Sequence, residues 1–197
     1  MNYGRKKLYK IALVSTHGTG KTTLCYDVAA QLKKRGFKVK VFSEIASSAY
    51  ERGIPINENT TLNAQMYIMM QHISEELIAG IRGYQIVVCD RSVFDNLVYM
   101  ERRCGKNDFM RDFLKHYSEK FPYDVIYKLP IVGELQDDGV RDFKNEEFRL
   151  DIYNRINEMF KDLQIDHKEL PLPTSQLRGE WADIIVQDAI EAFKPRQ

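Results

Sequence analysis

The chain has 197 residues, of which 44% are hydrophobic and 29% are charged, a composition typical of one soluble globular domain. Its 29 Lys and Arg residues nearly balance 28 Asp and Glu residues, and the net charge of +1 argues against a nucleic-acid partner or an anionic membrane surface. No apolar run reaches the roughly 18 residues of a membrane span. Three cysteines without a C-x-x-C pair exclude a disulfide scaffold or a cysteine-based zinc site and indicate a reducing compartment. We therefore expect a single domain over residues 1–197, located in the cytoplasm.

Short apolar runs alternate with helical patterns along the chain. Strands are expected at residues 8–14, 37–42, 86–89 and 125–129, with a weaker one at 167–170. Helices are expected at residues 22–34, 59–78, from 93 onward, 143–163 and 177–193. Nearly continuous apolar strands joined by helices indicate an α/β fold, in which a parallel sheet is covered on both faces. Because ligands bind beyond the carboxyl ends of such strands, we expect the chemistry there.

The first expected strand leads directly into a glycine-rich turn, Ser15-Thr-His-Gly-Thr-Gly-Lys-Thr22. This turn reproduces the phosphate-loop pattern G-x-x-x-x-G-K-[ST], except that Ser15 replaces the first glycine. Gly18 and Gly20 let the backbone approach a polyphosphate, and the N–H groups at the start of the following helix form an anion site. Lys21 would reach the β- and γ-phosphates, and the Thr22 hydroxyl would hold Mg²⁺.

The whole loop is predicted to bind the nucleotide, through Thr16, His17, Gly18, Thr19, Gly20, Lys21, Thr22 and Thr23. Thr23 would add a contact to the α-phosphate. His17 is expected to be a solvent-exposed or nucleotide-flanking side chain rather than a catalytic base. The alternative, a chance Gly-Lys-Thr tripeptide, is disfavoured because the loop lies between an expected strand and an expected helix.

Asp90 stands at the carboxyl end of the third expected strand and is followed by Arg91 and Ser92. A carboxylate at that end, beside the phosphate loop, can hold Mg²⁺ directly or through water. The alternative is that Asp90 or Ser92 caps the helix that begins at Val93. Since Ser92 suits the cap, we assign Asp90 to the metal ion and Arg91 to the phosphate acceptor.

Glu44 follows the second expected strand, with Ser43 as a candidate helix cap. Glu44 either complements the dipole of the next helix or accepts a proton from a substrate hydroxyl as a general base. Both interpretations stay open, and Asp90 is the other candidate base.

An acidic hinge that contains a glycine, Gln136-Asp-Asp-Gly-Val-Arg141, precedes the amphipathic helix expected at residues 143–163. Residues 134–163 are therefore predicted to form a lid over the nucleotide, with Arg141 and Arg149 as its arginines. An arginine brought in on closure would stabilise charge on the transferred phosphoryl group. The alternative is a solvated helix face with ion pairs among Glu146, Glu147 and Arg149.

Four segments in this order, THGTGKTTL, SEIA, CDRSVFDNLVY and QDDGVR, resemble the P-loop kinases. The likeness is nearest to the AAA-type ATP-binding domain family that includes the kinase part of NadR-like nicotinamide riboside kinases. The Asp-Arg-Ser element is also similar to that of nucleoside and thymidylate kinases. The resemblance implies a three-layer α/β/α P-loop NTPase fold, with a five-stranded parallel sheet in the order 2-3-1-4-5 and a helical lid. It also implies that Glu44 is the candidate base, that Arg91 contacts substrate phosphate or sugar, and that residues 171–175 lie near the adenine.

Together these features predict ATP- and Mg²⁺-dependent phosphoryl transfer to a small acceptor, which is a nucleoside, nicotinamide riboside or a nucleoside monophosphate. Catalysis is assigned to Lys21, Asp90, Arg141 and Glu44, acceptor binding to Glu44, Arg91 and Gln71, and Mg²⁺ binding to Thr22 and Asp90. The alternative is a nucleotide-gated ATP- or GTP-binding switch, or a slow NTPase without a small-molecule acceptor. A homodimer is compatible with the sequence. A polynucleotide kinase would need a basic groove, and Arg102, Arg103 and Lys106 form only a small cluster.

Overall fold

The structure is a computed structural model that describes residues 8–43, 45–132, 146–173 and 179–193. In chain order its elements are β1 (Tyr9–Val14), α1 (Lys21–Lys34), β2 (Val39–Phe42), α2 (Ile45–Glu51), a short 3₁₀ helix (Asn57–Asn59), α3 (Leu62–Ile81), β3 (Ile86–Asp90), α4 (Val93–Cys104), α5 (Asp108–Lys120), β4 (Val125–Lys128), α6 (Glu146–Asp162), β5 (Lys168–Glu169) and α7 (Gly179–Phe193). Helices and strands alternate through most of the chain, as a parallel sheet requires.

The five strands form one parallel sheet in the order β2-β3-β1-β4-β5, which confirms the order that the resemblance implies. β1 lies in the centre of the sheet, between β3 and β4. Leu13, near the end of β1, pairs with Asp90 at the end of β3 and with Tyr127 in β4. The turn that leaves β1 is therefore flanked by the carboxyl ends of both neighbouring strands.

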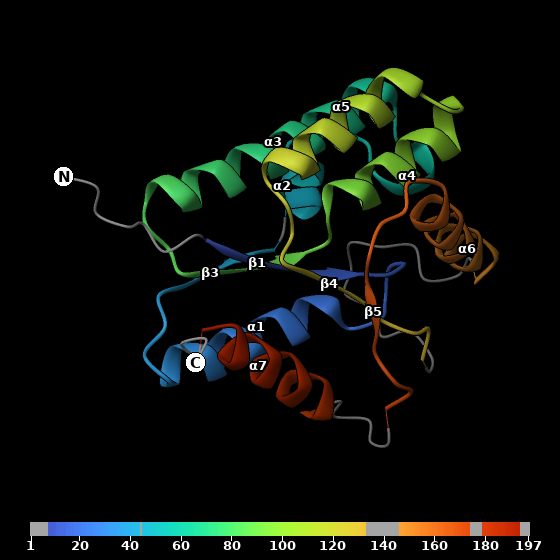
Figure 1. The fold of residues 1–197 in the computed structure, drawn as a ribbon. Coiled ribbons are helices and arrows are strands. Elements are labelled where there is room, and N and C mark those ends of the chain that lie inside the picture. The colour runs from blue at the N-terminus through green and yellow to red at the C-terminus, as the bar shows by residue number, and fades with distance from the viewer. Residues whose placement is uncertain (1–7, 44, 133–145, 174–178, 194–197) are drawn as a thin grey trace.

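Helices cover both faces of the sheet, so that the molecule has three layers (Figure 1). The side chains of β1 alternate between the two faces. Ile11 and Leu13 pack in a core cluster with residues of α1 and α7, among them the fully buried Trp181. Ala12 and Val14 pack in a second cluster with residues of α3, α4, α5 and α6. This arrangement is the three-layer α/β/α architecture that the sequence predicts.

Helix α5 has no counterpart among the elements expected from the sequence. Asn107 caps its first turn by accepting a hydrogen bond from the backbone N–H of Met110. Its buried residues are Met110, Leu114 and Tyr117, which recur at intervals of four and three. This spacing is typical of an amphipathic helix, so the sequence carried a signal for α5 although the helix was not predicted.

Helix α6 forms the second half of the segment that the sequence predicts to be a lid. Its buried residues include Ile152, Ile156 and Met159, which belong to the same core cluster as the buried face of α4. The Arg102 guanidinium on α4 also lies 2.6 Å from the Asp151 carboxylate on α6. Residues 146–162 are thus packed into the core, while residues 133–145, including the expected hinge, lie outside the described residues. Closure of a lid stays a prediction.

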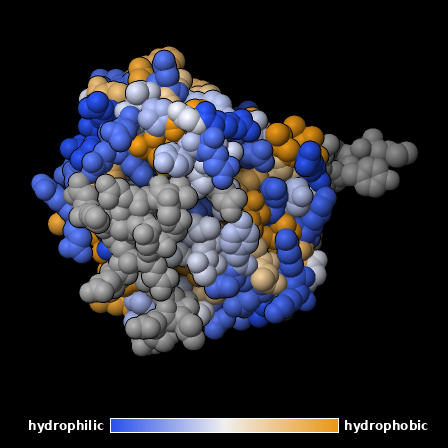
Figure 2. Space-filling view, turned by 180° about the vertical axis from the view of Figure 1, so that it is seen from behind, coloured by the Kyte–Doolittle hydropathy of each residue, from blue (hydrophilic) through white to orange (hydrophobic). Residues whose placement is uncertain are grey.

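The face of the molecule shown in Figure 2 is mainly hydrophilic, with smaller apolar patches between the polar side chains. Such scattered apolar residues are normal for a protein surface. Among the residues that the structure describes, every helix is too short or too polar to cross a membrane.

Candidate active site

The phosphate loop joins β1 to α1 through two glycines in the left-handed backbone region. Gly18 has φ 68°, and Gly20, the residue that precedes α1, has φ 80°. A side chain is disfavoured at such angles, so both positions require glycine. The first turn of α1 carries no acidic residue, and its backbone N–H groups and helix dipole face the loop. The local sequence therefore builds an anion site.

Ser15, which replaces the first glycine of the motif, is fully buried and has no positive φ. Its hydroxyl donates a hydrogen bond of 2.9 Å to the carbonyl oxygen of Leu129, the residue that follows β4. The backbone N–H of Leu129 in turn donates to the carbonyl oxygen of Val14. The departure from the motif thus fixes the start of the loop to the neighbouring strand.

Lys21 places a buried cation inside the loop. Its ammonium donates a hydrogen bond of 2.5 Å to the carbonyl oxygen of Thr16 and one of 3.3 Å to the Thr19 hydroxyl. The Thr19 hydroxyl itself donates to the Thr16 carbonyl oxygen at 3.2 Å. Lys21 is only 3% exposed. A buried cation within the loop is well suited to meet phosphate oxygens.

The structure brings together the two residues that the sequence assigns to Mg²⁺. The Thr22 hydroxyl, in the first turn of α1, donates a short hydrogen bond to the Asp90 carboxylate at the end of β3. Both side chains are partly exposed. A hydroxyl and a carboxylate oxygen side by side are ligands that Mg²⁺ prefers, and such a site needs only one or two protein ligands beside phosphates and water. The residues present therefore fit Mg²⁺.

The turn after β3 is strained and tightly held. Arg91 has φ 94°, in the left-handed region that non-glycine residues rarely adopt. Its backbone N–H donates to the carbonyl oxygen of Leu13 at 3.0 Å. Ser92 and Asp95 then form a capping box at the start of α4, with the Ser92 N–H donating to the Asp95 carboxylate at 2.8 Å. The predicted role of Ser92 as the cap is confirmed.

The strained turn directs the Arg91 side chain toward the first two turns of α4. Its guanidinium carbon lies 5.0 Å from the centre of the Tyr99 ring. Burial opposes the charge of Arg91, but Tyr99, Asp95 and Asp90 outweigh it, and together they raise the pKa of the guanidinium. Arg91 is thus a permanent cation next to the phosphate loop.

Two polar side chains on α4 are buried, and the charge of one of them, Asp95, interacts with that of Arg91. Asp95 is fully buried and Asn96 is 4% exposed. Within the described part of the chain, one carboxylate oxygen of Asp95 and the side-chain nitrogen of Asn96 have no hydrogen-bond partner. Burial raises the pKa of Asp95, although the charge of Arg91 and the hydrogen bonds from Ser92 oppose that rise. Buried polar atoms without partners are uncommon and point to a ligand that would supply them.

Phe148, in the first turn of α6, joins the phosphate loop to α4. Its ring centre lies 5.6 Å from that of His17 and 6.1 Å from that of Tyr99. The Arg102 guanidinium lies over the same ring, at 4.2 Å. His17 is 2% exposed, so the expectation of a solvent-exposed side chain is wrong, because Phe148 covers the imidazole. Binding of nucleotide near His17 stays a prediction.

The other predicted site residues have different surroundings. Arg149 is 3% exposed and so does not belong to the solvated helix face expected as the alternative, although Glu146 and Glu147 are exposed, and its lid role stays a prediction. Gln71, on α3, donates a hydrogen bond of 3.2 Å to the Tyr67 hydroxyl, and that hydroxyl also accepts one from Arg52. The contact of Gln71 is thus within its own helix, and the Arg52 that meets the same hydroxyl is the residue after α2. Thr23 is exposed.

Some predicted site residues lie outside the described residues, and three others emerge only from the structure. Glu44 and Arg141 belong to the first group, as do the last residues of the segment expected near the adenine, 174 and 175. Asp95, Asn96 and Phe148 are the residues that the sequence reasoning missed. The capping-box spacing of Ser92 and Asp95 was a signal for one of them. Phe148 had none, because its contacts join distant parts of the chain.

A glycine-rich turn between a central strand and a helix, a lysine and a threonine in that turn, and an aspartate at the end of the adjacent strand define a P-loop NTPase fold. A sequence model of the AAA domain family matches residues 10–178, and the chain belongs to this family. It is a member of the P-loop kinase superfamily.

Two thymidylate kinases are related to this chain in sequence. The chain is 30% identical over 136 residues to a probable thymidylate kinase of Archaeoglobus fulgidus, an alignment that covers 66% of this chain and 68% of that protein. It is 24% identical over 117 residues to a thymidylate kinase of Wolbachia sp. subsp. Brugia malayi, with coverage of 58% and 55%.

Two crystal structures of NadR proteins share the fold. The one in complex with NR has a TM-score of 0.71 and 18% identity and covers 98% of this chain. The one in complex with NAD and AMP-PNP has a TM-score of 0.67 and 16% identity and covers 96% of it. The chain spans about half the length of these NadR chains, 53% and 51% respectively. At 16–18% identity, this likeness establishes the fold alone.

Proposed function

We propose that this protein is an ATP- and Mg²⁺-dependent kinase that transfers the γ-phosphoryl group to a small nucleoside or nucleotide acceptor. The observation that carries the proposal is the hydrogen bond between Thr22 in the phosphate loop and Asp90 at the end of β3. It pairs an anion site with oxygen ligands for a metal ion, the combination that phosphoryl transfer needs. The kinase names of the sequence relatives and the AMP-PNP in one structural relative support it.

On the nucleotide side, the chain supplies a cation and a set of backbone donors. Lys21 would leave the Thr16 carbonyl oxygen and bind the β- and γ-phosphates, since a phosphate oxygen is a stronger acceptor than a carbonyl oxygen. Thr22 and Asp90 would hold Mg²⁺, which when bound neutralises the charge that develops on the phosphates. The arginines of the predicted lid, Arg141 and Arg149, would add further positive charge.

On the acceptor side, the proposed site lies between the Asp90 turn, α4 and the start of α6. Arg91 offers a cation to an acceptor phosphate or a donor to a sugar hydroxyl. The unpartnered oxygen of Asp95 would accept a hydrogen bond from an acceptor hydroxyl, and the amide nitrogen of Asn96 would donate one. Either Asp90 or Glu44 would orient the attacking hydroxyl as the general base.

An acceptor panel tests this function. The purified protein is incubated with ATP and Mg²⁺ and with nucleosides, nicotinamide riboside or nucleoside monophosphates, and ADP and the phosphorylated acceptor are measured. We expect ADP to form in proportion to a product that carries one added phosphoryl group. ADP release at the same rate with and without every acceptor would overturn the proposal and favour a slow NTPase or a nucleotide-gated switch.

A matched pair of lysine variants ties the activity to the loop. Lys21→Ala removes the buried cation, and we expect turnover to fall by about 10²-fold or more. Lys34, at the other end of the same helix, is exposed, so Lys34→Ala should keep turnover. Equal losses in both variants would show that turnover does not depend on the phosphate loop.

A further inference from the structure

A buried carboxylate on α3, remote in sequence from the phosphate loop, gathers donors from three other parts of the chain. Glu76 is 3% exposed. It accepts hydrogen bonds from the Lys10 ammonium at 2.6 Å, the Tyr117 hydroxyl at 2.7 Å and the Tyr123 hydroxyl at 2.6 Å. The His72 ring nitrogen, one helical turn away, lies 3.4 Å from it. These contacts hold β1, α3, α5 and the segment before β4 around one charge.

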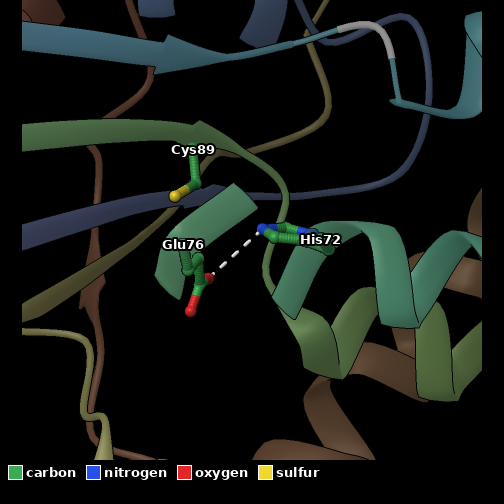
Figure 3. Close-up of side chains that lie close together, drawn as sticks. All are labelled: His72, Glu76 and Cys89. Carbon is green, nitrogen blue, oxygen red and sulfur yellow. Dashed lines mark ion pairs between the residues drawn. The ribbon is translucent and has the colours of Figure 1, made fainter. Parts of the chain in front are cut away.

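His72, Glu76 and Cys89 lie close enough together to suggest a metal site, with ligand atoms within 4.8 Å of one another (Figure 3). The surroundings argue against it. Both oxygens of Glu76 already accept hydrogen bonds, and the Lys10 ammonium would repel a cation. Burial raises the pKa of the Cys89 thiol well above its usual range, which disfavours the thiolate that a metal ion needs.

One donor in this cluster leads back to the candidate active site. The Tyr123 hydroxyl gives its proton to Glu76 and accepts a hydrogen bond of 3.0 Å from the backbone N–H of Val93. Val93 is the first residue of α4, a position whose N–H has no partner within the helix. With its proton committed to the carboxylate, the hydroxyl can only accept toward Val93. Glu76 therefore fixes Tyr123, and Tyr123 fixes the start of α4.

We propose that Tyr123, oriented by Glu76, is a positioning residue that holds the N-terminus of α4 and thereby the Arg91 turn in the geometry that binds the acceptor. The proposal rests on the function proposed above. Val93 is two residues from Arg91, whose positive φ is maintained only if both sides of the turn are held. On one side Leu13 accepts the Arg91 N–H, and on the other Tyr123 and the Ser92 capping box hold α4. The phosphate loop is fixed separately, through Ser15 and Leu129.

Two tyrosine variants separate positioning from stability. Tyr123→Phe and Tyr117→Phe each remove one hydroxyl that donates to Glu76, at 2.6 and 2.7 Å, and each keeps the ring beside Lys10. Only the Tyr123 hydroxyl also accepts from α4. We expect Tyr123→Phe to raise the KM of the acceptor about tenfold, because it loses the hydrogen bond from Val93, with the KM of ATP unchanged. We expect Tyr117→Phe to leave both KM values unchanged. The two substitutions should lower the Tm by similar amounts.

Amide hydrogen exchange in the free protein gives a readout that needs no kinase activity. The Val93 amide should be protected in the wild type and should exchange about tenfold faster in Tyr123→Phe but not in Tyr117→Phe. An unprotected Val93 amide in the wild type, or equal changes in the two variants, would overturn the positioning role. If the wild type phosphorylates no acceptor, the proposed function fails, while the exchange at Val93 still decides whether Tyr123 holds α4.

Discussion

The hydroxyl of Ser15 donates a hydrogen bond to the carbonyl oxygen of Leu129 over 2.9 Å. This bond joins the first residue of the phosphate loop to the residue after β4, across 114 positions of sequence. A glycine in place of Ser15, as in the usual motif, would free the backbone but lose this connection. In this chain the loop is therefore anchored by a side chain at the position where related loops have none.

Removal of the Ser15 hydroxyl is expected to destabilise the fold. Ser15→Ala leaves the buried Leu129 carbonyl oxygen without this donor, and we expect the free energy of unfolding to fall by about 1 kcal/mol. Urea denaturation measures the change. Ser118→Ala is the matched control, because the Ser118 hydroxyl bonds to the carbonyl oxygen of Lys115 on the surface of α5. An equal effect of the two substitutions would contradict the anchoring role.

Substitutions at Thr22 test the assignment of Mg²⁺. Thr22→Val keeps the shape of the side chain but loses the oxygen that contacts Asp90. We expect turnover to fall by about 10²-fold and the Mg²⁺ concentration for half-maximal rate to rise. Thr22→Ser keeps the hydroxyl and should stay close to the wild type. A magnesium titration of the kinase rate measures both variants, and a Thr22→Val enzyme with an unchanged Mg²⁺ requirement would remove Thr22 from the metal site.

Local sequence was sufficient to predict the parts of the site that are contiguous in the chain. The phosphate loop, the helix after it and the Ser92 cap each depend on a few neighbouring residues with specific backbone or side-chain properties, and the structure has all three. The central strands β1 and β3 followed from their continuous apolar runs. The ends of the elements were less accurate, since β5 comprises only residues 168 and 169 instead of 167–170.

Contacts between distant segments could not be predicted from the sequence. Lys10, Glu76 and Tyr123 lie in three different elements or loops, and nothing in the local pattern of any of them indicates the other two. The same holds for His17, whose burial depends on Phe148 and hence on the packing of α6. Single-sequence patterns report which face of an element is apolar and not which element covers it. The residues that connect the acceptor side of the site to the core therefore needed the structure.

The buried Glu76 carboxylate is expected to stabilise the buried Lys10 ammonium. Glu76→Gln leaves the buried Lys10 ammonium without its counter-charge, and we expect a loss of about 3–5 kcal/mol in the free energy of unfolding. The double variant Lys10→Met/Glu76→Gln removes both charges and should be more stable than Glu76→Gln alone. Chemical denaturation of the three variants measures the difference. A double variant no more stable than Glu76→Gln would show that the pair does not act through charge.

The Glu76 carboxylate also makes the stability of the fold depend on pH in the acidic range. Burial alone would raise the pKa of Glu76, but hydrogen bonds and charge from His72 and Lys10 lower it from its ordinary 4.5 to about 2. Because the folded protein binds the proton more weakly than the unfolded chain, this stabilisation is complete above pH 4.5 and is lost as the pH falls toward 2. The shift corresponds to about 3 kcal/mol. We expect Tm to fall over this range in the wild type and to fall less in Lys10→Met/Glu76→Gln; parallel curves would contradict the assignment.

Phe148 is expected to hold α6 against the phosphate loop. It is 4% exposed, and its ring contacts His17, Tyr99 and Arg102. Phe148→Ala would leave a cavity between α4, α6 and the loop, and we expect the free energy of unfolding to fall by about 3 kcal/mol or more. Leu150→Ala, on the same helix at a position that is 53% exposed, should change it by less than about 0.5 kcal/mol. Urea denaturation compares the two variants, and similar losses would mean that α6 is not held through Phe148.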